Sequence, residues 1–147
     1  MLFILSADLI TEEYYQDPIY RDKINRAVKN ILLGVFESKH LMCADYNVLV
    51  FFSDKITDID ALSTLYNIIN QYSFINYALI KRRINIVPQN SIHELIQDDG
   101  YDTINLSIDY FQDSKMIQPI IILGEDSMDT DFYYIISKFI CKKTTIT

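Results

Sequence analysis

Acidic side chains are the residues of this sequence whose type and spacing best suit chemistry. Asp8 follows the apolar run Leu2–Leu5, and Glu125 with Asp126 follows the apolar run Pro119–Leu123. If both runs are strands of one open α/β sheet, these carboxylates lie in the crevice beyond the strand ends, where such sheets bind ligands. Carboxylate oxygens are ligands that Mg²⁺ and Mn²⁺ prefer, and a bound metal can activate water for phosphoryl transfer. The pattern predicts a metal site formed by Asp8, Glu125 and Asp126.

A structural role competes with this interpretation. Asp126, Ser127 and Asp129 also stand where the first turn of a helix prefers anions and capping side chains. This placement requires no function, and we favour it for these three residues on that ground.

Residues 119–140 resemble the opening of a Toprim-like domain. The resemblance is carried by Ile120-Ile121-Ile122-Leu123-Gly124-Glu125-Asp126-Ser127-Met128-Asp129-Thr130-Asp131-Phe132-Tyr133, which reads as an apolar strand, a Glu, a short loop, an Asp and an aromatic helix start. It implies catalytic roles for Glu125, as general acid/base or metal ligand, and for Asp129, as the loop acid. The order of Glu and Gly is reversed here, and the family's later strand with paired aspartates has no counterpart in the 147 residues. The resemblance therefore implies an incomplete or degenerate site.

A second resemblance involves the N-terminal residues. Phe3-Ile4-Leu5-Ser6-Ala7-Asp8-Leu9-Ile10 is similar to the first strand of PIN-like nucleases and the turn that follows it. Ser6 stands where that family keeps a metal-binding Asp, which implies weakened or absent catalysis. Asp109, Glu125 and Asp126 are the further acids that such a site could use.

Other catalytic chemistries find little support in the residues. His40 and His93 have no partner at ligand spacing, and Cys43 and Cys141 match no metal or redox spacing, so we expect reduced thiols in a cytoplasmic protein. No serine has a Gly-x-Ser-x-Gly context. The three glycines stand alone, which argues against a phosphate-binding loop.

The elements that must position these residues alternate between strands and helices. We predict four strands, at Leu2–Leu5, Val48–Phe52, Ile104–Tyr110 and Pro119–Leu123. We predict four helices, from Pro18 to Phe36, from Thr57 or Asp58 to Tyr72, over Ile92–Gln97, and after Asp126. Residues 74–87 fit either state, and Asp98-Asp99-Gly100 is a turn. This order predicts a single α/β domain over residues 1–147, with a mostly parallel or mixed sheet flanked by helices.

The first long helix has the clearest stripe. Its apolar residues recur at steps of three and four and must be buried, whereas the opposite face is polar. The inner face comprises Ile24, Ala27, Val28, Ile31, Leu32, Val35 and Phe36, and the outer face Arg21, Asn25, Arg26, Lys29 and Asn30.

The net charge of the chain limits the kinds of molecule that it can bind. The formal net charge of −7 disfavours direct binding to nucleic acid, because phosphate contacts need clustered Lys and Arg. The basic run Lys81-Arg82-Arg83 is small, and we interpret it as a solvated turn. No apolar run is long enough to cross a membrane, and the N-terminus lacks the basic flank of a signal peptide. Frequent Ile, Asn and Lys indicate an AT-rich genome, as in many bacteria and phages.

Two functions remain open. The first is an acidic protein-interaction module without a cofactor (a subunit, adaptor or inhibitor) that acts on a protein partner, including a nucleic-acid-handling one. Its basis is the charge, the eleven tyrosines, which are favoured at interfaces, and the incomplete catalytic set. The alternative is a nuclease or phosphodiesterase dependent on Mg²⁺ or Mn²⁺, or the remnant of one. We favour the first function.

Overall fold

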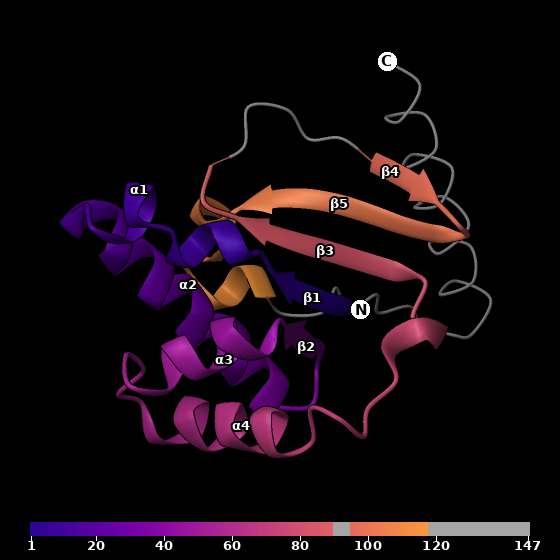
Figure 1. The fold of residues 1–147 in the computed structure, drawn as a ribbon, viewed down its shortest axis with the longest axis horizontal. Coiled ribbons are helices and arrows are strands. Elements are labelled where there is room, and N and C mark those ends of the chain that lie inside the picture. The colour runs from indigo at the N-terminus through magenta and orange to yellow at the C-terminus, as the bar shows by residue number, and fades with distance from the viewer. Residues whose placement is uncertain (90–94, 118–147) are drawn as a thin grey trace, which may run out of the picture.

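The computed structural model describes residues 1–89 and 95–117, and these ranges form the predicted α/β fold (Figure 1). Their strands make one sheet in the order β2-β1-β3-β5-β4. Strands β2, β1, β3 and β5 are parallel, and β4 pairs antiparallel with β5 at the edge. The strands are β1 (Leu2–Leu5), β2 (Leu41–Ala44), β3 (Arg82–Val87), β4 (Leu95–Asp98) and β5 (Tyr101–Ser107). The mixed, mostly parallel sheet confirms the predicted fold class, whereas the predicted strand at 119–123 and the helix after it lie outside the described residues.

Helix α2 (Pro18–Phe36) supplies much of the core. Asp17 caps it by accepting hydrogen bonds from the amides of Ile19 and Tyr20, and Pro18 occupies the first turn, where a missing N–H costs nothing. The predicted inner stripe is confirmed at Ile24, Ala27, Val28, Ile31 and Leu32, all fully buried.

Two residues of α2 were assigned to the wrong face. Phe36, in the last turn, is exposed. Asn30, expected on the polar face, is buried because its amide donates a 2.8 Å hydrogen bond to the carbonyl of Phe111. A buried amide is tolerated when it is paired in this way.

The predicted central strand Val48–Phe52 is wrong, because these residues belong to helix α3 (Tyr46–Ser53). Val48, Leu49 and Phe52 are buried and lie on one helical face, while Val50 is exposed. A short apolar run fits a strand or a buried helix equally well, and here tertiary packing outweighs the β-propensity of Val and Phe. The strand position beside β1 is taken instead by β2, which the sequence analysis did not identify.

The helix predicted over Ile92–Gln97 is also wrong for the part of it that the structure describes, which begins at Leu95. Leu95–Asp98 form β4, which pairs with β5 across the turn Asp98-Asp99-Gly100-Tyr101. Asp99 and Gly100 have φ angles of 47° and 80°. Two left-handed residues in a two-residue loop match the twist of a hairpin, so the predicted turn is confirmed but joins two strands.

The strand predicted over Ile104–Tyr110 stops earlier than expected. Strand β5 ends at Ser107, whose hydroxyl accepts from the amide of Asp109 and caps the 3₁₀ helix η3 (Ile108–Phe111). Ile108 and Phe111 are buried beside α2 instead of continuing the strand.

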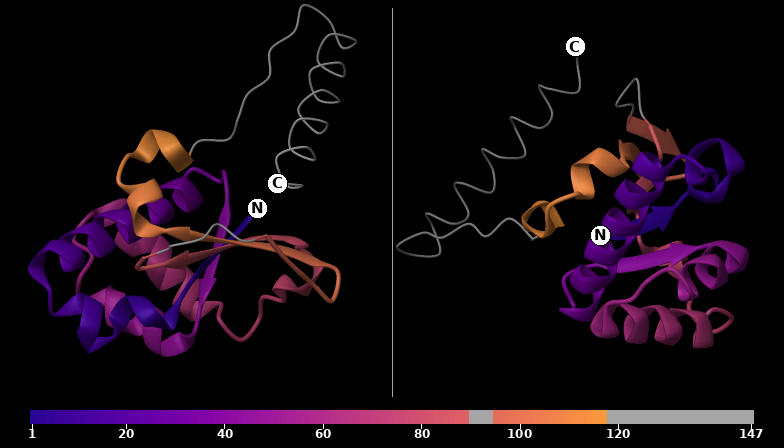
Figure 2. Two further views of the ribbon diagram at one scale, coloured as in Figure 1. Left: turned by 90° about the horizontal axis from the view of Figure 1, so that it is seen from above. Right: turned by 90° about the vertical axis from the view of Figure 1, so that its left-hand side faces the viewer.

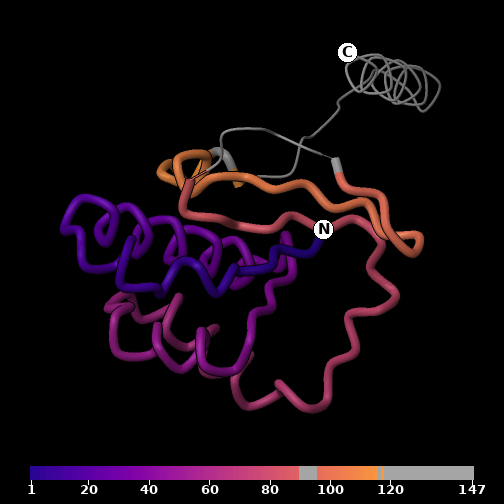
Figure 3. The backbone as a smooth tube through the Cα atoms, turned by 45° about the horizontal axis from the view of Figure 1, so that its top comes forward, coloured from indigo at the N-terminus to yellow at the C-terminus, as the bar shows by residue number. Residues whose placement is uncertain are grey.

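The remaining described helices are shorter than α2. Helix α4 (Ile59–Asn70) begins after Asp58, whose carboxylate caps it as predicted. A connection then runs along the outside of the molecule to β3 (Figure 3) and contains η2 (Tyr77–Leu79). The others are η1 (Ala7–Ile10), α1 (Glu12–Tyr15) and η4 (Ser114–Ile117). None of the helices in the described ranges is long and apolar enough to span a membrane.

The sheet presents two unlike faces. Alternate strand residues, among them Phe3, Leu5, Met42, Ala44 and Ile86, join α2, α3 and α4 in one buried core. The intervening residues point to the other face, because side chains alternate along a strand. Helix α4 lies at the end of the molecule opposite β4 (Figures 1 and 2).

Candidate functional site

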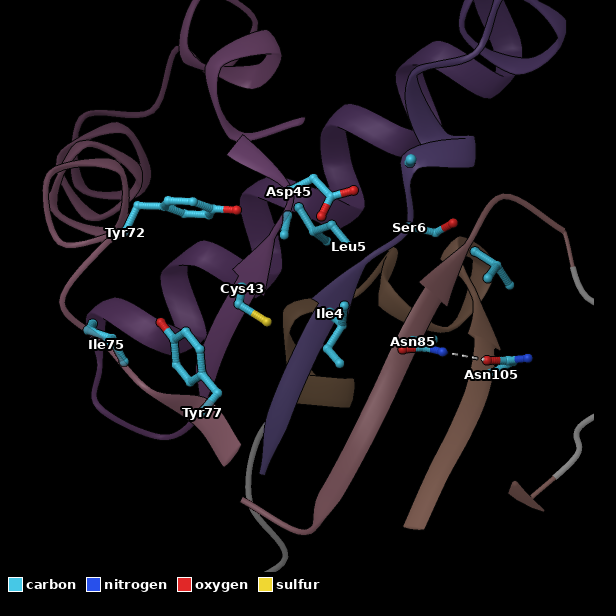
Figure 4. A pocket seen from close by; sticks show the side chains of 13 residues that line it. Ile4, Leu5, Ser6, Cys43, Asp45, Tyr72, Ile75, Tyr77, Asn85 and Asn105 are labelled. Carbon is cyan, nitrogen blue, oxygen red and sulfur yellow. Dashed lines mark hydrogen bonds between the residues drawn. The ribbon is translucent and has the colours of Figure 1, made fainter. Parts of the chain in front are cut away.

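A pocket of about 660 Å³ opens on the second face of the sheet, towards the carboxyl ends of the strands (Figure 4). Its volume is in the range of small-molecule sites. Strands β1, β2, β3 and β5 all contribute residues, and the connection after α4 completes the wall with Tyr72, Ile75 and Tyr77. Beyond the strand ends, Ser6 and Asp45 line it.

The topology places this pocket at a switch point of the sheet. The chain passes from β1 to β2 on one side of β1 and then crosses to β3 on the other side. Where strand order reverses, the loops leaving neighbouring strands diverge and leave a crevice, which is where open α/β sheets bind ligands. The sequence predicts a site at this edge of the sheet, although on Asp8, Glu125 and Asp126.

One row of side chains crosses the floor of the pocket. The parallel register aligns Cys43 of β2 with Ile4 of β1, Ile4 with Asn85 of β3, and Asn85 with Asn105 of β5. The Asn85 amide donates a 3.0 Å hydrogen bond to the Asn105 side-chain oxygen. The floor is therefore apolar below β1 and amide-lined below β3 and β5 (Figure 4).

Asp45 holds an unusual position for an acidic residue that precedes a helix. Asp17 and Asp58 both have extended backbones before α2 and α4, and both carboxylates accept hydrogen bonds from the first helical amides. Asp45 has the same extended backbone before α3, yet its side chain makes no capping hydrogen bond. Asp45 is instead one of the residues that line the pocket.

Burial keeps two other groups of the pocket, Cys43 and Tyr77, in their neutral forms at physiological pH. Burial raises the pKa of the Cys43 thiol from 9.0 to about 11, although nearby Arg83 opposes this rise. Burial likewise raises the pKa of Tyr77, whose hydroxyl donates to the Met42 carbonyl at 3.3 Å. Asp45 is thus the one formally charged side chain among the residues that line the pocket.

The basic run is not the solvated turn expected from sequence, because Arg82 and Arg83 begin β3 and Lys81 directly precedes it. The Arg83 guanidinium lies 3.7 Å from the Tyr101 ring centroid and donates hydrogen bonds to the carbonyls of Ile80 and Tyr77. Lys81 also lies over Tyr101, at 4.5 Å. Arg83 therefore anchors the connection after α4 to the sheet.

The predicted metal site is described only in part. Asp8 lies in η1, directly after β1, where it is exposed and where its amide bonds the Ser6 hydroxyl. It does not line the pocket. Glu125, Asp126 and Asp129 lie outside the described residues. Within residues 1–89 and 95–117, no three His, Cys, Asp or Glu side chains gather closely enough to hold a metal ion.

Asp109 and His40, which the sequence analysis also considered, both make contacts with neighbouring elements of the fold. Asp109, a further acid in the PIN-like comparison, forms a 3.0 Å ion pair with Lys23 of α2. His40 packs edge-to-face on Phe3, and its Nε2 bonds the carbonyl of Ile117. These contacts give His40 a structural role beside Phe3.

Asp45, Asn85 and Asn105 are the pocket residues that sequence reasoning missed. Asp45 follows β2 as Asp8 follows β1, so the same rule would have selected it had the strand been placed at Leu41–Ala44. The two asparagines carry no such signal, because only the register of β3 and β5 brings them together.

Comparison with known proteins gives no match: no family model, no curated protein and no solved structure is significantly similar to this chain.

Proposed function

We propose that this chain is a protein-interaction module (a subunit, adaptor or inhibitor) that binds its partner through the surface around the α4–β3 connection. The main evidence is a group of large apolar and aromatic side chains that are exposed on this surface. Phe74 is 85% and Leu79 is 87% exposed. We name the group the apolar surface, and it comprises Tyr46, Tyr72, Phe74, Ile75 and Leu79, all exposed.

Three members of the apolar surface lie close together, and the other two lie on the same connection. The Tyr46 and Tyr72 rings contact edge-to-face with centroids 5.5 Å apart, and Tyr72 and Ile75 line the same pocket. Phe74 and Leu79 lie on the same connection. Contiguous apolar patches are uncommon on monomers and often mark binding sites, and tyrosine is enriched at interfaces.

Charge suggests the kind of partner. The chain carries a net charge of −7, and acidic side chains border α3 and α4 at Asp45, Asp54, Asp58 and Asp60. Such a surface attracts a basic segment, and basic segments are frequent in proteins that handle nucleic acid. We infer a partner that offers apolar anchors flanked by Lys and Arg. We also infer a cytoplasmic location, where a free thiol such as Cys43 persists.

The test is site-specific photo-cross-linking followed by affinity measurement. A photoreactive phenylalanine at position 74 should cross-link one protein in cell extract, and the purified pair should bind reversibly. The variant Phe74→Ser/Leu79→Ser should weaken that binding by at least about tenfold, because interface anchors each contribute more than about 1 kcal/mol.

Ile19→Ser is the matched control, since Ile19 is 70% exposed but lies at the start of α2. Its binding should equal that of the unmodified chain. Equal binding by the Phe74→Ser/Leu79→Ser variant would contradict the proposed surface.

A metal-dependent nuclease or phosphodiesterase is the second proposal. What supports it is the position of Asp8 in η1, three residues beyond the end of β1, where Asp8 is exposed to solvent. Mg²⁺ or Mn²⁺ would be the cofactor. Calorimetric titration of Mn²⁺ into the chain should show a site that Asp8→Asn and Glu125→Gln each weaken. If neither substitution alters binding or nuclease activity, this proposal fails.

A further inference from the structure

The charge of the pocket selects against anionic ligands. Its lining contains one carboxylate, Asp45, and no Lys, Arg or His. Phosphate groups are held by Lys or Arg side chains or by several converging backbone N–H groups. The turn after β1 leads into η1, a 3₁₀ helix of four residues, and contains no glycine. It therefore lacks the loop that holds a pyrophosphate at a helix N-terminus. The ligand that fits is uncharged or cationic, without phosphate.

Asp45 favours a ligand with adjacent hydroxyl groups. In nucleotide-binding α/β sheets, an acidic residue beyond the second strand accepts hydrogen bonds from the ribose hydroxyls. Asp45 follows β2, which lies beside β1 in the same parallel arrangement. A carboxylate has two acceptor oxygens, which suit two neighbouring donors, and the Asp45 side chain bonds none of the first amides of α3.

Asn85 favours a planar group with a donor and an acceptor on one edge. One of its N–H groups bonds Asn105. The amide keeps an oxygen and a second N–H, the pair that reads the N6 and N7 edge of adenine. The Asn85 oxygen points away from Asn105, towards β1 and the middle of the pocket (Figure 4). Ile4 and Tyr72 provide apolar surface for a ring.

The two polar ends of the pocket are spaced for one ligand. Asp45 follows β2 and Asn85 lies in β3, with β1 between them. The register aligns Cys43 with Ile4 and Ile4 with Asn85, so Asp45 lies two interstrand spacings across the sheet and two residues further along it. The two backbone positions are therefore about 12 Å apart. A nucleoside carries its diol and the polar edge of its base at opposite ends. We propose that this pocket binds an unphosphorylated nucleoside, with the diol on Asp45 and the base edge on Asn85.

NMR titration of the full ¹⁵N-labelled chain with three probes tests the proposal. Adenosine should cause saturable shifts at the amides of Ile4 and Ser6 and at the Asn85 side chain. 2′,3′-Dideoxyadenosine should bind at least about tenfold more weakly, because the bidentate contact with a carboxylate is lost. AMP should bind more weakly than adenosine, since its phosphate meets no cation.

Paired variants assign the two contacts. Asp45→Asn should weaken adenosine about tenfold and leave dideoxyadenosine unchanged, whereas Asp54→Asn at the other end of α3 should alter neither. Asn85→Leu should weaken both probes, and Asn67→Leu, at an exposed position of α4, should have no effect. The Asp45→Asn variant should fold, because the Asp45 side chain makes no capping hydrogen bond to α3.

Several results would overturn the proposal. They are the absence of saturable shifts at millimolar adenosine, equal binding of adenosine and its dideoxy analogue, tighter binding of AMP, or unaltered binding by Asp45→Asn. The protein-interaction proposal is tested separately, because Phe74→Ser/Leu79→Ser alters no residue that lines the pocket.

Discussion

The two faces of the sheet use the same strands for different purposes. Phe3 is buried in the core and contacts Phe111 and His40 edge-to-face, whereas the next residue, Ile4, lies half-buried on the floor of the pocket. Met42 and Cys43 divide in the same way on β2. Since successive side chains point to opposite faces, one backbone can build a tightly packed core and an open recognition surface together.

The two faces of the sheet differ in polarity as well as in burial. The core face is apolar, and apolar burial stabilises the fold in proportion to the area removed from water. The pocket face carries Asn85 and Asn105 on the inner strands, where amides contribute less to hydrophobic stability. Residues that reduce packing yet lie in a row at a ligand crevice indicate a role in binding.

The largest expected difference between the two faces is in how much their side chains contribute to the free energy of unfolding. Phe3→Ala should reduce the free energy of unfolding by about 3–5 kcal/mol, because it leaves a cavity between α2 and the sheet. Ile4→Ala, one residue later, should cost less than about 2 kcal/mol, since the pocket already adjoins its side chain. Urea unfolding followed by circular dichroism measures both. Equal losses would show that the faces are packed alike.

The next difference concerns the reactivity of Cys43. Its pKa is raised from 9.0 to about 11 by burial, so the thiolate fraction at pH 8 is about 100-fold smaller than that of an unperturbed thiol. In a Cys141→Ser background, iodoacetamide should alkylate Cys43 roughly 100-fold more slowly than a free cysteine peptide. Urea should remove the protection. Rapid alkylation of the folded chain would show that the pocket thiol is solvated and reactive.

Sequence reasoning identified most elements whose signals are local. Helix α2 has a stripe, a capping Asp17 and Pro18 at its start, and helix α4 has its capping Asp58; both were placed within a few residues of their bounds. Strand β1 was predicted with the observed bounds. In these segments periodicity and end signals agree, so tertiary context changes little.

The failures occur where local signals conflict with packing. Val48–Phe52 has strand propensity but is held as a helix by buried contacts of Val48, Leu49 and Phe52. That error concealed β2, and with it the significance of Asp45. The pairing of Asn85 with Asn105 depends on the register of strands 20 residues apart, which no local pattern encodes. The site was thus predictable as a place in the fold, but not as a set of residues.

The smallest expected difference is a pH dependence confined to the core face. Burial lowers the pKa of His40 below its usual 6.5, and the positive N-terminus and Lys39 lower it further, although the hydrogen bond to Ile117 opposes this. Its Nδ1 is buried without a hydrogen-bond partner in the described part of the chain. Protonation would therefore bury a charge and an unsatisfied donor.

The sign of the effect follows from this lowered pKa. The unfolded chain binds a proton at His40 more readily than the folded chain, so stability is complete above pH 6.5 and declines as the pH falls towards the lower folded pKa. Urea unfolding between pH 7.5 and 5.5 should show this decline in the unmodified chain and a smaller one in His40→Gln. His93→Gln is the matched control and should retain the full decline. An identical pH profile for His40→Gln would mean that His40 is already solvated, and that the core face is open beside Phe3.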